Sequence, residues 1–346
     1  MAKEFLEANA TWVLLAPVEN VSLTRFSGLS YRIHRVELVA ANSLPHRWKQ
    51  IGLPAKLSRL KQGSYLDHFF DEVETFATIR MRGVGVDVER KLLRLVREEL
   101  AILALSQLGF AKRHSISVPS LSEEYRTGSR SHFLVRSDQV SWSQPNKTLG
   151  HPSPLVLDRQ WMTFQRKLFF DRLLDALRGK VRLGRAWCKD LRNAAILVGQ
   201  SLCSRDLPQA FLWNMIALEL LLTKSGDTVE KALPSRAEAF LGWMGYWNEA
   251  GYEDRIKDIY SKRCLLVHQG RRDEITLRDV YFTDDLLLNL FANIVGHLTI
   301  FHSKDAVIEF SRKVEAERLL GLSGKVRPKT LTFMRRAYRE RDFEMG

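Results

Sequence analysis

An arginine and a histidine, Arg263 and His268, stand close together in the segment IKDIYSKRCLLVHQG, residues 256–270. An arginine guanidinium can hold a phosphate group through two parallel hydrogen bonds. A histidine imidazole can accept or release a proton near neutral pH. Placed together, the two groups could cleave RNA without a metal ion, so this pair is the first candidate for chemistry in the chain.

The spacing of the two residues carries little weight by itself. In a chain with nine histidines, chance gives about two or three arginines that are followed by a histidine after four to six residues. A second such pair, Arg126 and His132, lies in a polar stretch with Gly128, which is typical of a surface loop. What distinguishes Arg263 and His268 is the sequence around them.

The residues around Arg263 follow the repeat of an amphipathic helix that ends near Gly270. The positions with helical spacing are Ile256, Ile259, Tyr260, Arg263 and Val267. Five positions on an α-helix correspond to about 140° of rotation and about 7.5 Å of rise, so Arg263 and His268 do not project side by side from one regular helix. Either the helix ends or distorts near His268, or two copies of the chain pair so that each cleft draws on both helices.

These residues also have structural interpretations. Arg263 could pair with Asp258 or Glu253, and His268 could lie at a helix C-terminus, where the macrodipole favours a cation. Glu219 lies in an apolar segment and needs a partner, because burying an unpaired carboxylate is costly. Arg263 and a structural cation are both possible partners.

Composition favours a protein that meets polyanions. The 346 residues carry a formal net charge of +13, which points to nucleic acid first, acidic lipid second and phosphorylated small molecules third. The alternative is a charge that only keeps the protein from aggregating. The three cysteines are far apart and predict neither a zinc site nor a disulfide framework. No convincing signal peptide or membrane span is present, so a cytoplasmic protein without membrane contact is expected.

The chain length and pattern predict two domains and a tail. Residues 1–150 mix strands, expected to begin at Thr11, Tyr31, Thr75, His114 and Ser131, with one amphipathic helix over residues 88–109. This is an α+β domain without a phosphate-binding glycine loop. Residues 143–154 form the best linker.

Residues 155–305 read as a bundle of helices. The first two expected helices cover residues 161–179 and 183–203. A third begins at an Asp206 N-cap with Pro208 in its first turn. A fourth covers residues 235–244, and the motif helix is the fifth. Thr283 or Asp284 is expected to cap a last apolar helix.

Residues 306–346 predict a basic helical tail. Phe333 and Tyr338 alternate there with cations and could stack on bases, or could pack against the bundle while the cations stay solvated.

With the motif placed in a helical bundle, residues from about 182 to 302 resemble an HEPN domain, specifically its ApeA-like branch. That branch carries a pattern similar to Tyr-x-x-Arg-small-x-x-Val-His-x-Gly in the penultimate bundle helix. The matching residues are Tyr260, Arg263, Cys264, Val267, His268 and Gly270. The segment ALELL around Glu219 and the stretch SRAEAFLG, residues 235–242, are also similar to the family. The fold class expected is therefore an α+β N-terminal domain followed by an all-α HEPN-like helical bundle.

The resemblance implies a metal-independent endoribonuclease that needs no cofactor. His268 would act as general acid or base, Arg263 would clamp the scissile phosphate, and Glu219 would orient one of them. HEPN nucleases are usually dimers whose clefts draw on both chains, so a two-fold homodimer through this helix is expected. Attack by the 2′-oxygen would leave a 2′,3′-cyclic phosphate and would exclude DNA.

Further residues are expected around this cleft. Tyr260 and Cys264, where many HEPN nucleases carry a polar residue, would lie in it. Asn289 and Asn293 recur with His297 as a polar stripe, which suits a cleft, a subunit interface, a solvent-exposed face or ordinary bundle hydrogen bonds. The RNA contacts are expected from Arg271, Arg272, Arg335 and Arg336.

The biological role follows only from the resemblance. It implies a toxin or antiviral effector that acts on tRNA or mRNA, with a trigger or a regulatory protein acting at the N-terminal domain. The alternative is a non-catalytic nucleic-acid-binding or assembly module with the same bundle. A third possibility is a small-molecule or nucleotide sensor that uses the same cleft.

Overall fold

A computed structural model describes residues 9–24, 28–47, 49–52, 73–121, 134–135, 142–143, 153–241, 252–322, 326–334 and 336–344. The described residues form two compact units. The N-terminal unit takes its residues from 1–100 and 115–162, and the helical unit from 101–114 and 163–346. Across the described residues, no helix is both long enough and apolar enough to cross a membrane.

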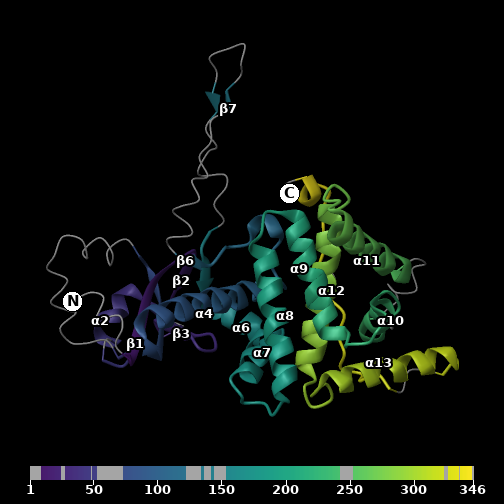
Figure 1. Ribbon diagram of the computed structural model, residues 1–346, viewed down its shortest axis with the longest axis horizontal. Helices are drawn as coiled ribbons and strands as arrows, with labels where there is room; N and C mark the ends of the chain where they lie inside the picture. The colour runs from purple at the N-terminus through teal and green to yellow at the C-terminus, as the bar shows by residue number, and fades with distance from the viewer. Residues whose placement is uncertain are drawn as a thin grey trace. The chain divides into compact units, whose positions relative to one another are not determined.

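The N-terminal unit is built on an antiparallel five-stranded sheet with strand order β3-β4-β5-β1-β6 (Figure 1). Its two long strands, β1 and β5, pair from Asn9↔Val84 to Val18↔Thr75. The bounds are β1 (Asn9–Glu19), β3 (Ser30–Arg32), β4 (Glu37–Ala40), β5 (Thr75–Val84) and β6 (Ser120–Leu121). Two further strand pairs are β2 (Val21–Leu23) with β9 (Leu155–Leu157), and β7 (Leu134–Val135) with β8 (Trp142–Ser143).

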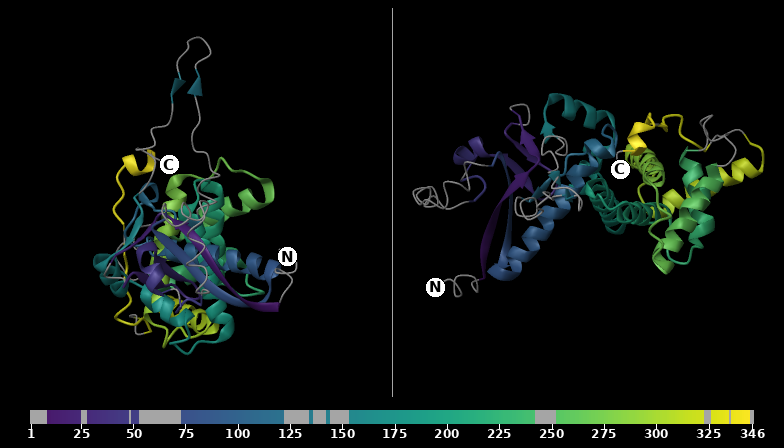
Figure 2. Two further views of the ribbon diagram at one scale, coloured as in Figure 1. Left: turned by 90° about the vertical axis from the view of Figure 1, so that its left-hand side faces the viewer. Right: turned by 90° about the horizontal axis from the view of Figure 1, so that it is seen from above.

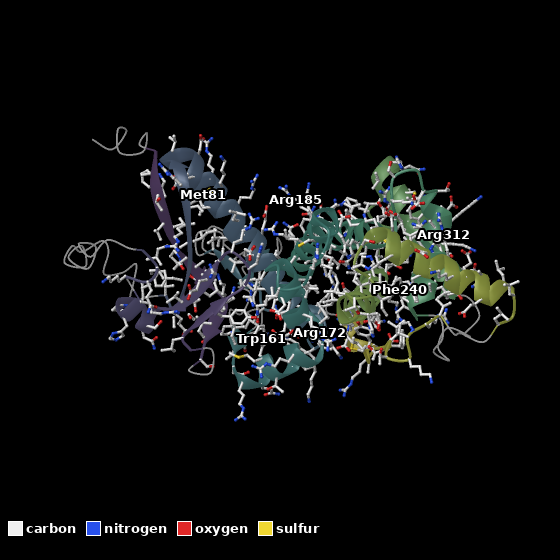
Figure 3. All side chains as sticks on the ribbon, turned by 90° about the horizontal axis from the view of Figure 1, so that it is seen from below. Met81, Trp161, Arg172, Arg185, Phe240 and Arg312 are labelled. Atoms are coloured by element: carbon white, nitrogen blue, oxygen red, sulfur yellow. The ribbon has the colours of Figure 1, made fainter. Side chains whose placement is uncertain are left out.

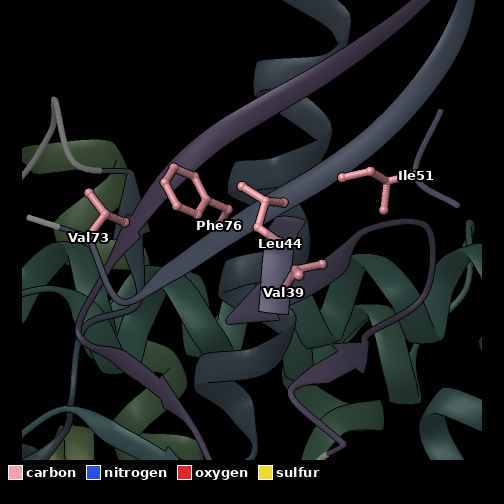
Figure 4. Packing of buried hydrophobic residues seen from close by; sticks show 5 residues of the cluster. All are labelled: Val39, Leu44, Ile51, Val73 and Phe76. Carbon is pink, nitrogen blue, oxygen red and sulfur yellow. The ribbon is translucent and has the colours of Figure 1, made fainter. Parts of the chain in front are cut away.

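One helix covers the apolar side of this sheet. Helix α4 (Gly85–Leu105) follows β5 without a loop and runs back along the strands (Figure 2). A cluster of Val39, Leu44, Ile51, Val73 and Phe76 forms a second small core in the unit (Figure 4). Leu44 belongs to α2 (Leu44–Arg47), so the turn after β4 closes over its own sheet.

The strand predictions are largely confirmed in this unit. The segments from Thr11 and Thr75 lie in β1 and β5, and the segment from Tyr31 forms β3 and β4 with a tight turn between them. The strand expected from His114 is wrong, because residues 113–115 form a 3-10 turn and the chain stays irregular up to β6. Most of the expected linker, residues 144–152, and the pair Arg126 and His132 lie outside the described residues.

The helical unit contains successive helices (Figure 1) that pack around α9. Their bounds are α6 (Arg159–Lys167), which begins in the N-terminal unit, α7 (Phe170–Leu177), α8 (Arg185–Cys203), α9 (Leu207–Leu222), α10 (Val229–Leu241), α11 (Tyr252–Gln269), α12 (Leu277–Gly296), α13 (Lys304–Leu319) and α14 (Arg341–Glu344). The mixed fold class, with a sheet in the N-terminal part and helices in the C-terminal part, is confirmed.

Helix starts show where the sequence patterns succeed and fail. Asp206 caps α9 as expected, accepting a hydrogen bond from the Gln209 N–H at 3.2 Å. The expected cap of the last apolar helix is wrong. Helix α12 begins with a capping box of Thr276 and Asp279, whereas Thr283 lies inside the helix and is buried.

A buried carboxylate, Asp284, joins several segments of the helical unit. Arg113 donates to both of its oxygens at 2.7 and 2.8 Å, and also to the carbonyl and hydroxyl of Ser201 on α8. Asn214 on α9 donates to Asp284 at 2.8 Å. The Asp284 side chain is 0% exposed. A buried charge persists only when it is paired and hydrogen-bonded, so this network requires α8, α9 and α12 to assemble together.

The C-terminal tail differs from the helical tail that was expected. Residues 306–319 belong to α13, residues 326–334 and 336–340 are irregular, and the short α14 follows as the last described helix. Tyr338 packs on Tyr281 with ring centroids 4.4 Å apart, and its hydroxyl donates to Asp285 at 3.0 Å. Burial raises the pKa of Tyr338. The alternative in which the tail aromatics pack on the bundle therefore holds for Tyr338.

The Asp284 network predicts a large loss of stability when its cation is removed. In Arg113→Met, Asp284 keeps its hydrogen bond from Asn214 and an Arg336 nitrogen 3.7 Å away. It loses the two hydrogen bonds from the Arg113 guanidinium, its closest positive charge. We expect the free energy of unfolding to fall by about 3 kcal/mol or more, measured by urea denaturation. Arg312→Met on α13 (Figure 3), an exposed arginine, is the control and should change it by at most about 0.5 kcal/mol. Equal effects in both variants would contradict this account.

Candidate functional site

Two helices bring a carboxylate and a guanidinium together at the motif. Glu219 on α9 lies opposite Arg263 on α11, with Arg263 Nε 3.1 Å from Glu219 Oε1 and Nη2 donating to Oε2 at 3.3 Å. Both side chains are 20% exposed, so the pair is shielded but reachable from solvent. Arg263 therefore pairs with Glu219. The alternative partner Asp258 instead lies 3.5 Å from Arg255, and the side chain of Glu253 lies outside the described residues.

His268 lies on the same helix but points elsewhere. Helix α11 continues through His268 to Gln269 and ends at Gly270. Gly270 has a φ of 67°, which a residue without a β-carbon adopts without strain, and its N–H donates to the Leu266 carbonyl. The helix is thus regular between the two motif residues, and they point about 140° apart. His268 is exposed. Of the two geometric solutions, a distorted helix before His268 is excluded.

Two further motif residues surround the guanidinium. Arg263 lies over the ring of Tyr260, 5.9 Å from its centroid. Burial, the neighbouring Cys264 thiol and a hydrogen bond with it raise the pKa of Tyr260, and Arg263 opposes that rise. Tyr260 and Cys264 are both half-buried. Glu219, Tyr260, Arg263 and Cys264 thus form one patch on the described surface, which we call the Arg263 patch.

The apolar residues of α11 become more exposed toward its C-terminal end. In its first half, Ile256 and Ile259 are 1% and 0% exposed. In its second half no residue is buried, although Leu265 and Leu266 are apolar and Val267 is 46% exposed. Val267 and the partly exposed Leu265 and Leu266 thus form a small apolar surface beside the motif.

The arginines expected to contact RNA differ in exposure and in the partners they bind. Arg271 and Arg272 follow α11 and are 48% and 61% exposed; Arg271 pairs with Glu274, and Arg272 with Asp206 at 2.6 Å. The Arg272 hydrogen bond lowers the pKa of Asp206. Exposed ion pairs contribute little to the free energy of folding, so a phosphate can compete with the carboxylates for both arginines. Arg335 lies outside the described residues.

The burial and pairing of Arg336 do not fit the RNA contact that was expected. Its side chain is 10% exposed, its Nε donates to Asp285 at 2.7 Å, and Nη1 donates to the Leu108 carbonyl at 3.1 Å. The neighbouring carboxylates raise the pKa of Arg336 although burial lowers it. Its role in the described structure is to anchor the tail, and contact with RNA would break that anchor.

The polar stripe on α12 serves the tail and not a cleft. The Asn289 amide exchanges two hydrogen bonds with the backbone of Met334, at 2.7 and 2.8 Å. Asn293 does the same with Thr332, at 2.8 and 2.9 Å. His297 Nε2 contacts the Thr330 hydroxyl at 2.7 Å. Both asparagines are 1% exposed, so they do not line an open cleft in one chain, and the interpretation as bundle hydrogen bonds holds.

Sequence reasoning missed one group that supports the motif helix. Asp279, fully buried at the start of α12, accepts from Arg255 at 2.9 Å and from Lys262 at 3.0 and 3.1 Å, both on α11. Burial raises the pKa of Asp279, but hydrogen bonds from Thr276 and Lys262 outweigh burial and lower it. The Thr-x-x-Asp pattern at residues 276–279 is a capping-box signal that could have identified it.

The two asparagines generate a prediction about the tail. Asn289→Ala removes the acceptor of the Met334 N–H, and Asn293→Ala removes that of the Thr332 N–H. We expect amide exchange to rise by about tenfold at the matching residue, measured by hydrogen exchange with residue resolution. Each variant serves as the control for the other. Unchanged protection of both amides in both variants would show that the asparagines do not hold the tail.

Comparison with family models, curated proteins and solved structures finds no match to this chain. An assignment of function therefore has to start from the residues themselves. Among the described residues, the Arg263 patch with His268, Val267, Arg271 and Arg272 beside it is the group whose chemistry is most specific.

Proposed function

We propose that the helical unit is a metal-independent endoribonuclease of HEPN type, active as a homodimer. The observation that carries this proposal is the Arg263–Glu219 pair between α9 and α11, 3.1 Å apart and 20% exposed. The motif arginine lies beside an acidic residue of α9, which supports the positioning part that the resemblance implies for Glu219. His268, exposed one turn further on, supplies a proton-transfer group.

Each residue has a defined part in the reaction. His268 takes the proton from a ribose 2′-hydroxyl or gives one to the departing 5′-oxygen. The 2′-oxygen attacks phosphorus, the bond from phosphorus to the 5′-oxygen breaks, and a 2′,3′-cyclic phosphate and a 5′-hydroxyl result. Arg263 holds the scissile phosphate and offsets the charge that develops on it. Glu219 is a positioning residue that holds the guanidinium in place.

The dimer solves the geometric problem of the motif helix. Because Arg263 and His268 of one chain point about 140° apart, a phosphate held by Arg263 is reached by His268 of a second copy. The partly exposed Leu265 and Leu266 and the exposed Val267 support an interface at this part of α11. A two-fold axis through α11 would cover these residues and form two equivalent clefts.

A specific observation favours a second function. Arg263 already donates one hydrogen bond to Glu219 through Nη2, and its Nε lies 3.1 Å from Glu219 Oε1. Cys264 follows Arg263 in the chain, at a position where many HEPN nucleases carry a polar residue. A guanidinium held in this way suits a module that binds RNA and does not cut it. Such a module would bind RNA through Arg271 and Arg272 with strong salt dependence and release no cyclic phosphate.

The proposal predicts complete loss of cleavage when either motif residue is removed. Purified protein is incubated with tRNA and total RNA in EDTA, and the new 3′ ends are identified. We expect 2′,3′-cyclic phosphate ends from the wild type and a loss of at least about a hundredfold in Arg263→Ala and His268→Ala. Glu219→Gln should lose less.

The controls use exposed residues of the same types, Arg312→Ala and His302→Ala, which should keep full activity. Circular dichroism shows that the variants fold. Undiminished cleavage in both motif variants would refute the proposal, as would a monomer by light scattering that still cuts RNA. Salt-dependent RNA binding without cleavage at any pH would favour the non-catalytic module.

A further inference from the structure

A pocket of about 500 Å³ lies in the N-terminal unit, away from the Arg263 patch in sequence. It is lined by the β3–β4 turn, by β5, by α4 and by residues that follow α2. Pockets of about 300–1,000 Å³ suit small organic ligands. This pocket is therefore large enough for a nucleotide.

The sheet itself creates the opening. Strand β4 pairs with only the first part of β5, and its last pair is Glu37↔Thr78. In the described part of the sheet, no strand pairs with residues 79–84 of β5 on the edge opposite β1. The pocket lies at this step, where the chain between β3 and β4 turns away before it reaches Ile79.

The turn that leads into β4 presents arginines to the pocket. Arg32 and Arg35 flank it, and Arg80 adds a third guanidinium from β5; all three are exposed. Glu37 is the acidic residue of the lining, and Arg47 holds it at 2.9 Å. Within the described residues, no carboxylate pairs with the guanidinium of Arg35 or Arg80. The lining thus carries an excess of positive charge that a small anion can neutralise.

A buried carboxylate fixes this turn before any ligand binds. Glu99 of α4 accepts the backbone N–H groups of His34 at 2.9 Å and Arg35 at 3.3 Å, and its Oε1 lies 3.2 Å from His34 Nδ1. Its side chain is 0% exposed. The Ile33 N–H also donates to the Val36 carbonyl at 3.0 Å. A turn held at both ends keeps its arginines in place, which reduces the entropy cost of binding.

The rest of the lining mixes the polar side chains of His34, Gln50 and Thr78 with apolar ones. Ile51, Ile79 and Leu95 are 8%, 9% and 8% exposed, and Met81 on β5 (Figure 3) is half-buried. A ligand with several negative charges at one end and a flat group with polar edges at the other therefore matches this lining. Arginine forks match phosphate oxygens, and a thioether packs well on an aromatic ring.

We propose that this pocket binds a nucleoside di- or triphosphate, with the phosphates on Arg32, Arg35 and Arg80 and the base against Met81 and Leu95. The site is separate in sequence and in unit from the Arg263 patch. It stands whether or not the helical unit cleaves RNA. Binding at this site gives the N-terminal unit a small-molecule ligand of its own.

The test is calorimetric titration of the full chain in EDTA with each of the four ribonucleoside triphosphates, ADP, adenosine and inorganic triphosphate. We expect at least one nucleoside triphosphate to bind, and adenosine not to bind. Arg35→Gln and Arg80→Gln should each raise the dissociation constant by about tenfold or more. Arg90→Gln, an exposed arginine of α4 outside the lining, should leave it unchanged.

Two variants distinguish a nucleotide held in this pocket from a polyanion held elsewhere on the chain. Met81→Thr should weaken nucleotide binding but not triphosphate binding, because only the base contacts Met81. Arg263→Ala should leave binding unchanged. No binding by any nucleotide, equal affinity for adenosine, equal affinity for inorganic triphosphate or loss of binding in Arg263→Ala would each overturn the proposal, and none of these results bears on RNA cleavage.

Discussion

The helical unit depends on one buried charge, the carboxylate of Asp284. It lies in the middle of α12 with no exposed surface, where an unpaired carboxylate would be far too costly to keep. Its partners come from separate parts of the chain: Arg113 from the segment after α4, Asn214 from α9 and, at a longer distance, Arg336 from the tail. Because each partner satisfies the same group, the positions of these segments are set together.

This constraint decides which residues remain for function. Helix α9, held by Asn214, carries Glu219, and Glu219 in turn fixes Arg263 on α11. Asp279 ties the same helix to the start of α12 through Arg255 and Lys262. The polar side chains of α12 and the cation at 336 are used inside the unit. Among the described residues of the helical unit, the second half of α11 and the two arginines that follow it stay wholly or partly exposed, and the sequence motif lies there.

Local patterns predicted elements well and partners poorly. The Asp206 cap and the paired strands β1 and β5 could be predicted, because each depends on residues near one another in sequence or on simple alternation. Asp284 could not be recognised as a buried ion, since its partner Arg113 lies 171 residues away. No local pattern in the sequence shows that Arg113 and Asp284 come into contact in the fold. For the same reason, the basic tail suggested RNA contacts, while Arg336 is used to anchor it.

The central claim is that Arg263 of one chain works with His268 of another. Co-expression of Arg263→Ala and His268→Ala chains with different tags, followed by isolation of the mixed dimer, tests this most directly. Each single variant is inactive in both clefts, but the mixed dimer has one cleft with both residues intact and should recover about half of the wild-type cleavage rate in EDTA. A mixed dimer no more active than either variant alone would contradict the account.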